Sequence, residues 1–107
     1  MPTYMYRIQP VRPEMLSIGH TDDETRISGE HYEYLKQLMA DGILILAGRT
    51  LNTDYSSHDI AIFEARDDDH MREITANDPA VRQKIFRAEW YPYRIALHEP
   101  SNVNQEQ

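Results

Sequence analysis

Hydrophobic and polar positions alternate in two stretches of the chain. In residues 4–11, Tyr4, Tyr6 and Ile8 alternate with more polar neighbours, and prolines close the stretch. A period of two is typical of a strand that is buried on one face. Residues 59–65 form a second stretch rich in β-formers. Both are predicted to be strands.

Between Thr21 and Gly42 the hydrophobic positions repeat with the period of a helix. Thr21 and Glu24 have the spacing of a capping box, and Gly42 supplies a stop signal. Gly29 weakens the helix locally, so its start could fall as late as Ser28. Four side chains at spacings of four, four and three residues share one stripe: Ile27, His31, Leu35 and Leu38. One histidine therefore lies on the face that should be buried.

A continuous apolar run at residues 43–48 is bounded by glycines, which predicts a strand covered on both faces. The polar loop of about ten residues that follows allows antiparallel pairing with residues 59–65. A second helix is predicted over residues 66–78, capped by Asp67 or Asp68 and ended by an Asp-Pro pair. Its inward residues should be Met71, Ile74 and Thr75.

The remaining chain completes the pattern. A short helical turn is expected after the Asp-Pro pair, then a long final strand over residues 87–99 whose Pro92 indicates a sheet edge or a bulge. The order strand, helix, strand, strand, helix, strand is that of an α+β, ferredoxin-like fold. Its helices should cover one face of a four-stranded antiparallel sheet. We predict one domain over residues 1–98, a disordered polar tail over residues 99–107, and a homodimer formed through the uncovered sheet face.

Composition narrows the function. The net charge of −7, from 11 basic and 18 acidic residues, opposes binding to a phosphate backbone, so no nucleic-acid partner is expected. The chain has no cysteine, no glycine-rich phosphate-binding motif and no histidine spacing typical of zinc, so neither cofactor nor metal is predicted. The run DDDH at residues 67–70 reads as a solvated helix cap rather than a cation site. No membrane segment is expected, and we interpret the protein as cytoplasmic.

Two stretches resemble a known family. EHYEYLKQLMADGILILAG at residues 30–48 and ITANDPAV at residues 74–81 are similar to the signatures of the YciI-like, or YCII-related, family. The resemblance covers about residues 4–97. It implies a dimeric α+β barrel, a histidine and an aspartate that meet in a pocket as a catalytic pair, and a relation to small-molecule enzymes of the muconolactone isomerase and dehydrochlorinase kind. The two family positions fall on His31 and Asp78, whereas Arg49 stands where the family often has proline.

The residues support the pair independently. An unpaired buried imidazole nitrogen costs about 1–3 kcal/mol, so His31 needs a partner, and Asp78 at the end of the second helix is a suitable one. A carboxylate on one nitrogen fixes the tautomer and leaves the other nitrogen free to exchange a proton. The alternative is that His31 is a satisfied core histidine and Asp78 only caps a turn. The spacing does not exclude it.

Two other features bear on whether a ligand binds. Arg49, just past the apolar strand, is suited to hold a carboxylate or enolate oxygen at a pocket rim, but an exposed ion pair with one of the many acidic residues is the favoured interpretation. Five aromatic residues are assigned to the core or a dimer interface in preference to a ligand site: Tyr4, Tyr6, Trp90, Tyr91 and Tyr93.

Two hypotheses remain. In the first, the protein is an isomerase or lyase in which His31, oriented by Asp78, moves a proton on a small substrate without a cofactor. In the second, it is a non-catalytic module that binds a small ligand or only stabilises a dimer. The sequence does not separate them.

Overall fold

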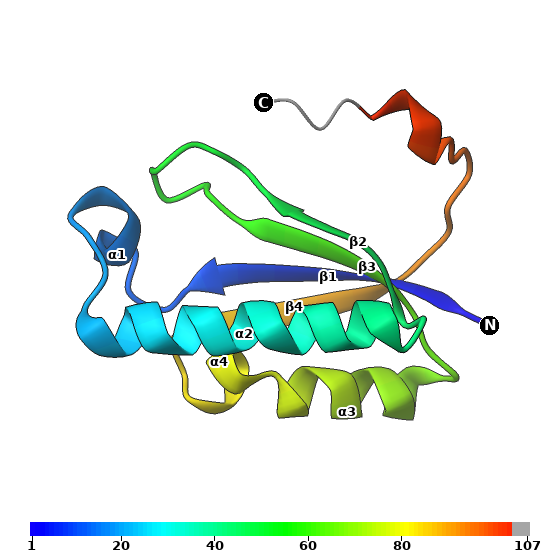
Figure 1. Ribbon diagram of the computed structural model, residues 1–107, viewed down its shortest axis with the longest axis horizontal. Coiled ribbons are helices and arrows are strands. Elements are labelled where there is room, and N and C mark those ends of the chain that lie inside the picture. Colours follow the sequence, from blue (N-terminus) through cyan, green and yellow to red (C-terminus); the bar gives the residue numbers. More distant parts are fainter. Residues whose placement is uncertain (104–107) are drawn as a thin grey trace.

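Helices cover one face of an antiparallel sheet whose strand order is β2-β3-β1-β4 (Figure 1). The computed structural model describes residues 1–103. The elements of this part of the chain are β1 Thr3–Pro10, α1 Glu14–Ser17, α2 Asp22–Ala40, β2 Leu44–Arg49, β3 Asp59–Glu64, α3 Asp68–Asn77, α4 Pro79–Arg82, β4 Phe86–Tyr93 and a 3-10 turn η1 Pro100–Asn102. The α+β, ferredoxin-like fold is confirmed. The short helix α1 was not expected from the sequence.

Helix α2 begins and ends as its sequence predicts. The Thr21 hydroxyl accepts a hydrogen bond from the Glu24 N–H at 3.1 Å, and the Glu24 carboxylate accepts one from the Thr21 N–H at 2.8 Å. Arg12 adds an ion pair to Glu24, with Nη2 and Oε1 2.6 Å apart. Gly42 follows the helix with φ of +78°, a backbone conformation that disfavours a side chain.

The core lies between the sheet and the helices. On β1 the alternation predicted from sequence holds, because Tyr4, Tyr6 and Ile8 are all buried on the helix side. The rings of Tyr6 and Phe63 meet edge to face with centroids 5.5 Å apart. Leu38 from α2 and Ile74 from α3 close this layer. Thr75 is only half-buried, and its hydroxyl donates to the Met71 carbonyl.

Two strand predictions were wrong. The apolar run at residues 43–48 does not form a strand covered on both faces, because β2 is an edge strand and Leu46 is 58% exposed. The final strand ends at Tyr93, not at residue 99. The stretch after it has apolar residues but pairs with no described strand, and Leu97 is 95% exposed. Apolar character alone therefore misled both predictions, since pairing and burial depend on neighbours.

The break between the two C-terminal helices is as predicted. Asp67 caps α3 by accepting a hydrogen bond from the His70 N–H, so the DDDH run is a helix cap. Asp78 both ends α3 and caps α4, with an extended backbone of ψ 119° before Pro79. Pro92 lies on β4, an edge strand, as its sequence indicated.

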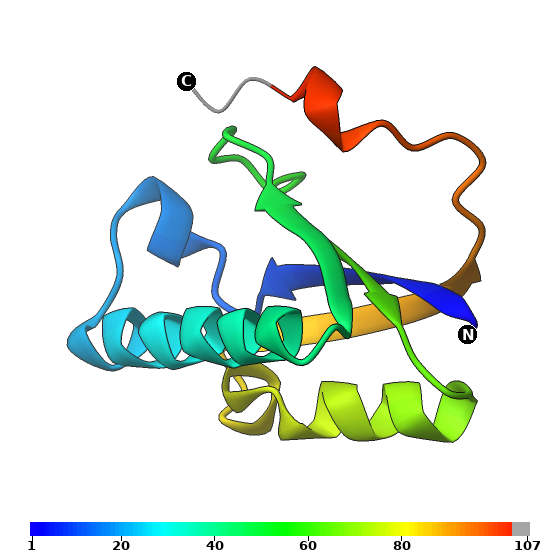
Figure 2. The same cartoon turned by 45° about the vertical axis from the view of Figure 1, so that its right-hand side comes forward.

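The sheet face away from the helices is uncovered over the described residues. Large apolar side chains exposed on it are Leu46, Ile60, Tyr91 and Tyr93. Residues 94–103, after β4, run on this side of the sheet but stand off from it (Figures 1 and 2), and nearly all of them are exposed. Residues 104–107 of the predicted tail lie outside the described residues, and the described part contains the turn η1. No described helix is long and apolar enough to cross a membrane.

Candidate active site

His31 and Asp78 meet inside the protein, although they are 47 positions apart in the sequence. The His31 Nδ1 lies 2.9 Å from each Asp78 carboxylate oxygen. His31 is 6% exposed and Asp78 is fully buried. The contact arises because His31 sits on the buried stripe of α2, and α4, whose N-terminus Asp78 caps, packs against that helix. The structure thus brings together the two residues that the sequence paired.

Further hydrogen bonds hold the Asp78 carboxylate in place. The Tyr6 hydroxyl donates to Oδ2 at 2.8 Å, and the Ala80 N–H donates to Oδ1 at 3.0 Å. Burial and the adjacent carboxylate both raise the pKa of Tyr6 far above its ordinary value. Burial, with a contribution from the same carboxylate, raises the pKa of Tyr34 to about 12. Both phenols therefore stay protonated, and Tyr6 remains a donor that orients Asp78.

This arrangement determines the state of the imidazole. A carboxylate that accepts from Tyr6 and Ala80 also accepts from His31, so Nδ1 carries a proton. In neutral His31 the other nitrogen, Nε2, is then unprotonated and can accept a proton. Nε2 is buried and has no hydrogen-bond partner among the described residues. The rings of Phe86 and His31 meet edge to face, with centroids 5.4 Å apart.

A cavity of about 280 Å³ borders the imidazole. It lies between α2 and the β2–β3 hairpin, and its walls are mostly apolar. The residues that line it are Tyr6, Ile8, His31, Tyr32, Leu35, Ala47, Gly48, Arg49, Asp59, Ile60 and Ala61. A second cavity of about 190 Å³ lies on the side of α1, and Met15, Ser28 and Phe86 help to line it. The buried Ser28 hydroxyl also lacks a partner among the described residues.

Four residues border both cavities: His31, Tyr32, Arg49 and Asp59. Arg49 thus lies at a pocket, as the sequence suggested. Its guanidinium forms no ion pair with a described residue, so the exposed ion pair favoured from the sequence is not present there.

Sequence reasoning missed Asp59. It opens β3, and its Cα pairs with that of Arg49 across the hairpin. Burial raises the pKa of the Asp59 carboxyl, while His31, Arg49 and His58 act in the opposite direction. The sequence signal that could have identified Asp59 was the hairpin, because the register of its two strands places Asp59 beside Arg49.

The aromatic residues divide between the two faces of the sheet. Tyr4 and Trp90 pack edge to face in the core with centroids 5.6 Å apart, whereas Tyr91 and Tyr93 are exposed on the uncovered face. Tyr6 is a core residue that also lines the larger cavity. No group of three or more metal-ligating side chains occurs within residues 1–103.

The fold and site define an α+β, ferredoxin-like protein with a buried histidine–aspartate pair beside a cavity. A sequence comparison matches residues 4–91 to the YCII-related domain, and the chain belongs to this family. The resemblance inferred from the two signature stretches is thereby confirmed. No functionally curated protein is significantly similar in sequence.

The solved structures that match this chain include the following two. One is 5-chloro-2-hydroxyhydroquinone dehydrochlorinase from Burkholderia phenoliruptrix AC1100 in complex with 2,5-dihydroxybenzoquinone, with a TM-score of 0.61, 20% sequence identity, and coverage of 94% of this chain and 99% of that chain. The other is a dimeric ferredoxin-like protein from an uncultured marine organism, with a TM-score of 0.45, 8% identity, and coverage of 92% and 98%. At this identity the dehydrochlorinase likeness establishes the shared fold.

Proposed function

We propose that the protein is a small-molecule enzyme of the isomerase or lyase type, in which His31 transfers a proton and Asp78 orients it. The observation that carries this proposal is an imidazole whose Nδ1 is held at 2.9 Å by a buried carboxylate and whose Nε2, beside a cavity, has no hydrogen-bond partner within residues 1–103. A purely structural histidine would have both nitrogens satisfied, because leaving one unpaired costs about 1–3 kcal/mol.

The chemistry follows from the hydrogen bonds. When Nε2 takes a proton from a substrate, the imidazole becomes a cation, and the adjacent Asp78 carboxylate stabilises it. Tyr6 and Ala80 keep that carboxylate in position, so it does not rotate when the charge appears. A group held in this way needs little reorganisation during the reaction.

The cavity indicates the size and character of the substrate. A cavity of about 150 Å³ holds a benzene molecule. The larger cavity here, about 280 Å³, has room for one substituted ring. Its apolar walls suit the ring, and Arg49 is placed to hold an anionic or enolate oxygen. The dehydrochlorinase of similar fold was solved with a dihydroxylated quinone, which supports cyclic compounds bearing oxygen substituents as the substrate class.

Deuterium exchange tests this proposal directly. Cyclohexanone, a single ring with one carbonyl group, is incubated with the protein in D₂O, and loss of the protons next to the carbonyl is followed by ¹H NMR. The wild type should accelerate exchange above the buffer rate. His31→Gln should reduce the acceleration about 100-fold or more, the usual contribution of a general acid or base. His98→Gln is the matched control, because His98 is exposed and distant in sequence from the site.

A thermal-shift screen of phenols, quinones and lactones complements this measurement, since a ligand that binds the folded state raises the melting temperature. If ligands stabilise the wild type but His31→Gln changes neither binding nor exchange, the enzyme proposal is wrong. Stabilisation that depends on His31, with no exchange or turnover of any screened ring, would favour the non-catalytic binding module.

We propose in addition that two copies of the chain pack through the uncovered sheet face. On this face Leu46 pairs with Ile62, Ile62 with Met5, and Met5 with Tyr91, so these residues form one row across the sheet. Leu46 is 58% exposed and Tyr91 is 44% exposed. Contiguous apolar surface of this kind usually marks an interface. Light scattering at micromolar concentration should give two chains per particle, and Leu46→Glu should give one. Tyr32→Glu is the control, because Tyr32 is 61% exposed on α2, on the opposite side of the sheet.

A further inference from the structure

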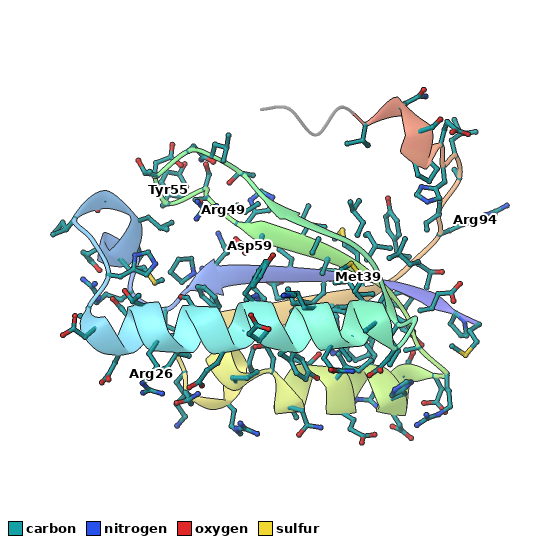
Figure 3. The ribbon with its side chains drawn as sticks, in the orientation of Figure 1. Arg26, Met39, Arg49, Tyr55, Asp59 and Arg94 are labelled. Atoms are coloured by element: carbon teal, nitrogen blue, oxygen red, sulfur yellow. The ribbon has the colours of Figure 1, made fainter. Side chains whose placement is uncertain are left out.

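Polar groups reach the shared border of the two cavities from opposite walls. His31 comes from α2, whereas Arg49 and Asp59 come from the open end of the β2–β3 hairpin and lie between that hairpin and the helix layer (Figure 3). The remaining lining of the larger cavity is mainly apolar. A molecule in this space would have His31 on one side and Asp59 on the other.

The surroundings of Asp59 are unusual for an aspartate. Its carboxylate accepts no hydrogen bond from residues 1–103, and none of their basic groups lies within the 4.0 Å of an ion pair. This holds even though Arg49 is its cross-strand partner. Burial raises its pKa, and this effect outweighs the opposing charges of His31, Arg49 and His58. The carboxyl therefore keeps a proton more readily than an exposed aspartate does. A carboxyl poised in this way can act as an acid.

We propose that Asp59 is a second catalytic residue, the acid that donates a proton to a substrate oxygen while His31 removes one from the neighbouring carbon. This inference rests on the proposed function and extends it. It names the substrate class as small cyclic ketones or lactones with a proton on the carbon beside the carbonyl, and the reaction as enolisation.

The step balances without a further reactant. The bond between the carbon and its proton breaks, and the proton goes to the Nε2 of His31. The electron pair forms the carbon–carbon double bond, and the carbonyl oxygen takes the proton of the Asp59 carboxyl. The product is the enol, and the enzyme is left with a His31 cation and an Asp59 carboxylate. Exchange of one proton with water at each residue restores the starting state.

Asp59 is better suited to this role than the neighbouring cation. An arginine does not release its proton in proteins, so Arg49 can hold a developing negative charge but cannot neutralise it. The groups facing Asp59 that bear on its pH dependence are His31 and Tyr32 from α2, Arg49 from β2, the adjacent His58, and His20 from the loop before α2.

The pH profile of cyclohexanone exchange distinguishes an acid from a structural residue. Because Asp59 must be protonated and His31 neutral, the wild-type rate should fall at both acidic and alkaline pH. In Asp59→Asn the rate at the optimum should drop about 100-fold, and the alkaline fall should disappear. Asp59→Glu, which keeps a carboxyl, should retain the alkaline fall. The control Asp41→Asn removes an equal charge from an exposed position at the end of α2 and should leave the profile unchanged.

The outcomes separate the two proposals. If Asp59→Asn keeps both the rate and the alkaline fall while His31→Gln loses exchange, Asp59 is not the acid and the proposed function stands. If His31→Gln also keeps the rate, or the wild type shows no exchange, both proposals are wrong. Should Asp59→Asn not fold, ¹³C NMR of the wild-type aspartate carboxyls decides the matter. The Asp59 carbon should then titrate above the ordinary range of an aspartate, and a midpoint within or below that range overturns the inference.

Discussion

Two regions of helix α2 differ, although one buried stripe runs along it. Near its C-terminal end, Leu38 packs with Leu44 and Phe63 into a core that excludes water. Near its middle, the same stripe presents His31 to a buried carboxylate and to two cavities. Close packing stabilises a fold, whereas space and unpaired polar atoms weaken it. The comparison teaches that one helix supplies stability near its C-terminal end and a candidate site near its middle.

The shape of the sheet accounts for the difference. The β2–β3 hairpin splays away from α2 toward its loop end, so that the layers separate there, while the opposite end stays closed (Figure 1). Side chains at the separated end cannot fill the space, and Ala47, Gly48 and Ala61 are the small residues that line it. The predictions below test this division from the largest expected effect to the smallest.

Phe63→Ala should have the largest effect. Phe63 is fully buried in the packed end, and truncating such a ring costs about 3–5 kcal/mol of the free energy of unfolding. Urea denaturation followed by circular dichroism measures this loss. Tyr55→Ala is the control, since Tyr55 is 87% exposed, and it should change the free energy by less than about 0.5 kcal/mol. Equal losses in the two variants would refute the assignment of the core to this end.

Asp78→Asn should have the next largest effect. Three donors, from Tyr6, His31 and Ala80, converge on this carboxylate. An asparagine keeps one acceptor oxygen, but its NH2 group is a donor and would face another donor. Losing a buried charged hydrogen-bond acceptor costs about 2–3 kcal/mol. Urea denaturation at neutral pH measures it, with Asp41→Asn as control. An unchanged midpoint would mean that the network does not form in solution.

Glu24→Gln should have a smaller effect that depends on pH. Hydrogen bonds from Arg12 and from the Thr21 backbone lower the pKa of Glu24 from 4.5 to about 2. A lowered pKa stabilises the fold above pH 4.5, and this contribution is lost as the pH falls toward 2. The variant should therefore melt a few degrees lower at pH 7 and equal the wild type near pH 2. Calorimetry at several pH values checks this, and a difference that persists at pH 2 would assign the loss to packing instead.

Asp59→Asn should have the smallest effect on stability, and it should stabilise the protein where the other variants destabilise it. The raised pKa of Asp59 means that its carboxylate is less favourable in the folded protein than in the unfolded chain. The wild type is therefore penalised at neutral pH, and the penalty disappears once the carboxyl is protonated in both states. The variant should melt a degree or two higher at pH 7 and equal to the wild type at pH 3. A destabilised variant would show that Asp59 supports the fold.

Much of the fold was predictable because it depends on local chemistry. The capping box at Thr21, the buried stripe through His31, and the break at Asp78 each involve residues within a few positions of one another. The two errors concerned strands, whose burial depends on which segment lies beside them. The apolar run before Arg49 has the same sequence pattern whether or not another segment covers the strand.

The sequence by itself determined the order of the main strands and helices, from periodicity, capping and turn chemistry, and its two signature stretches indicated the family and singled out His31 and Asp78. Both kinds of signal lie within short segments of the chain. Only the tertiary structure decided that His31 Nδ1 and Asp78 lie 2.9 Å apart, that Nε2 has no partner in the described part of the chain, and that Asp59 faces the same space. Those facts depend on how helices pack on a twisted sheet, a property of the whole molecule that no single segment encodes.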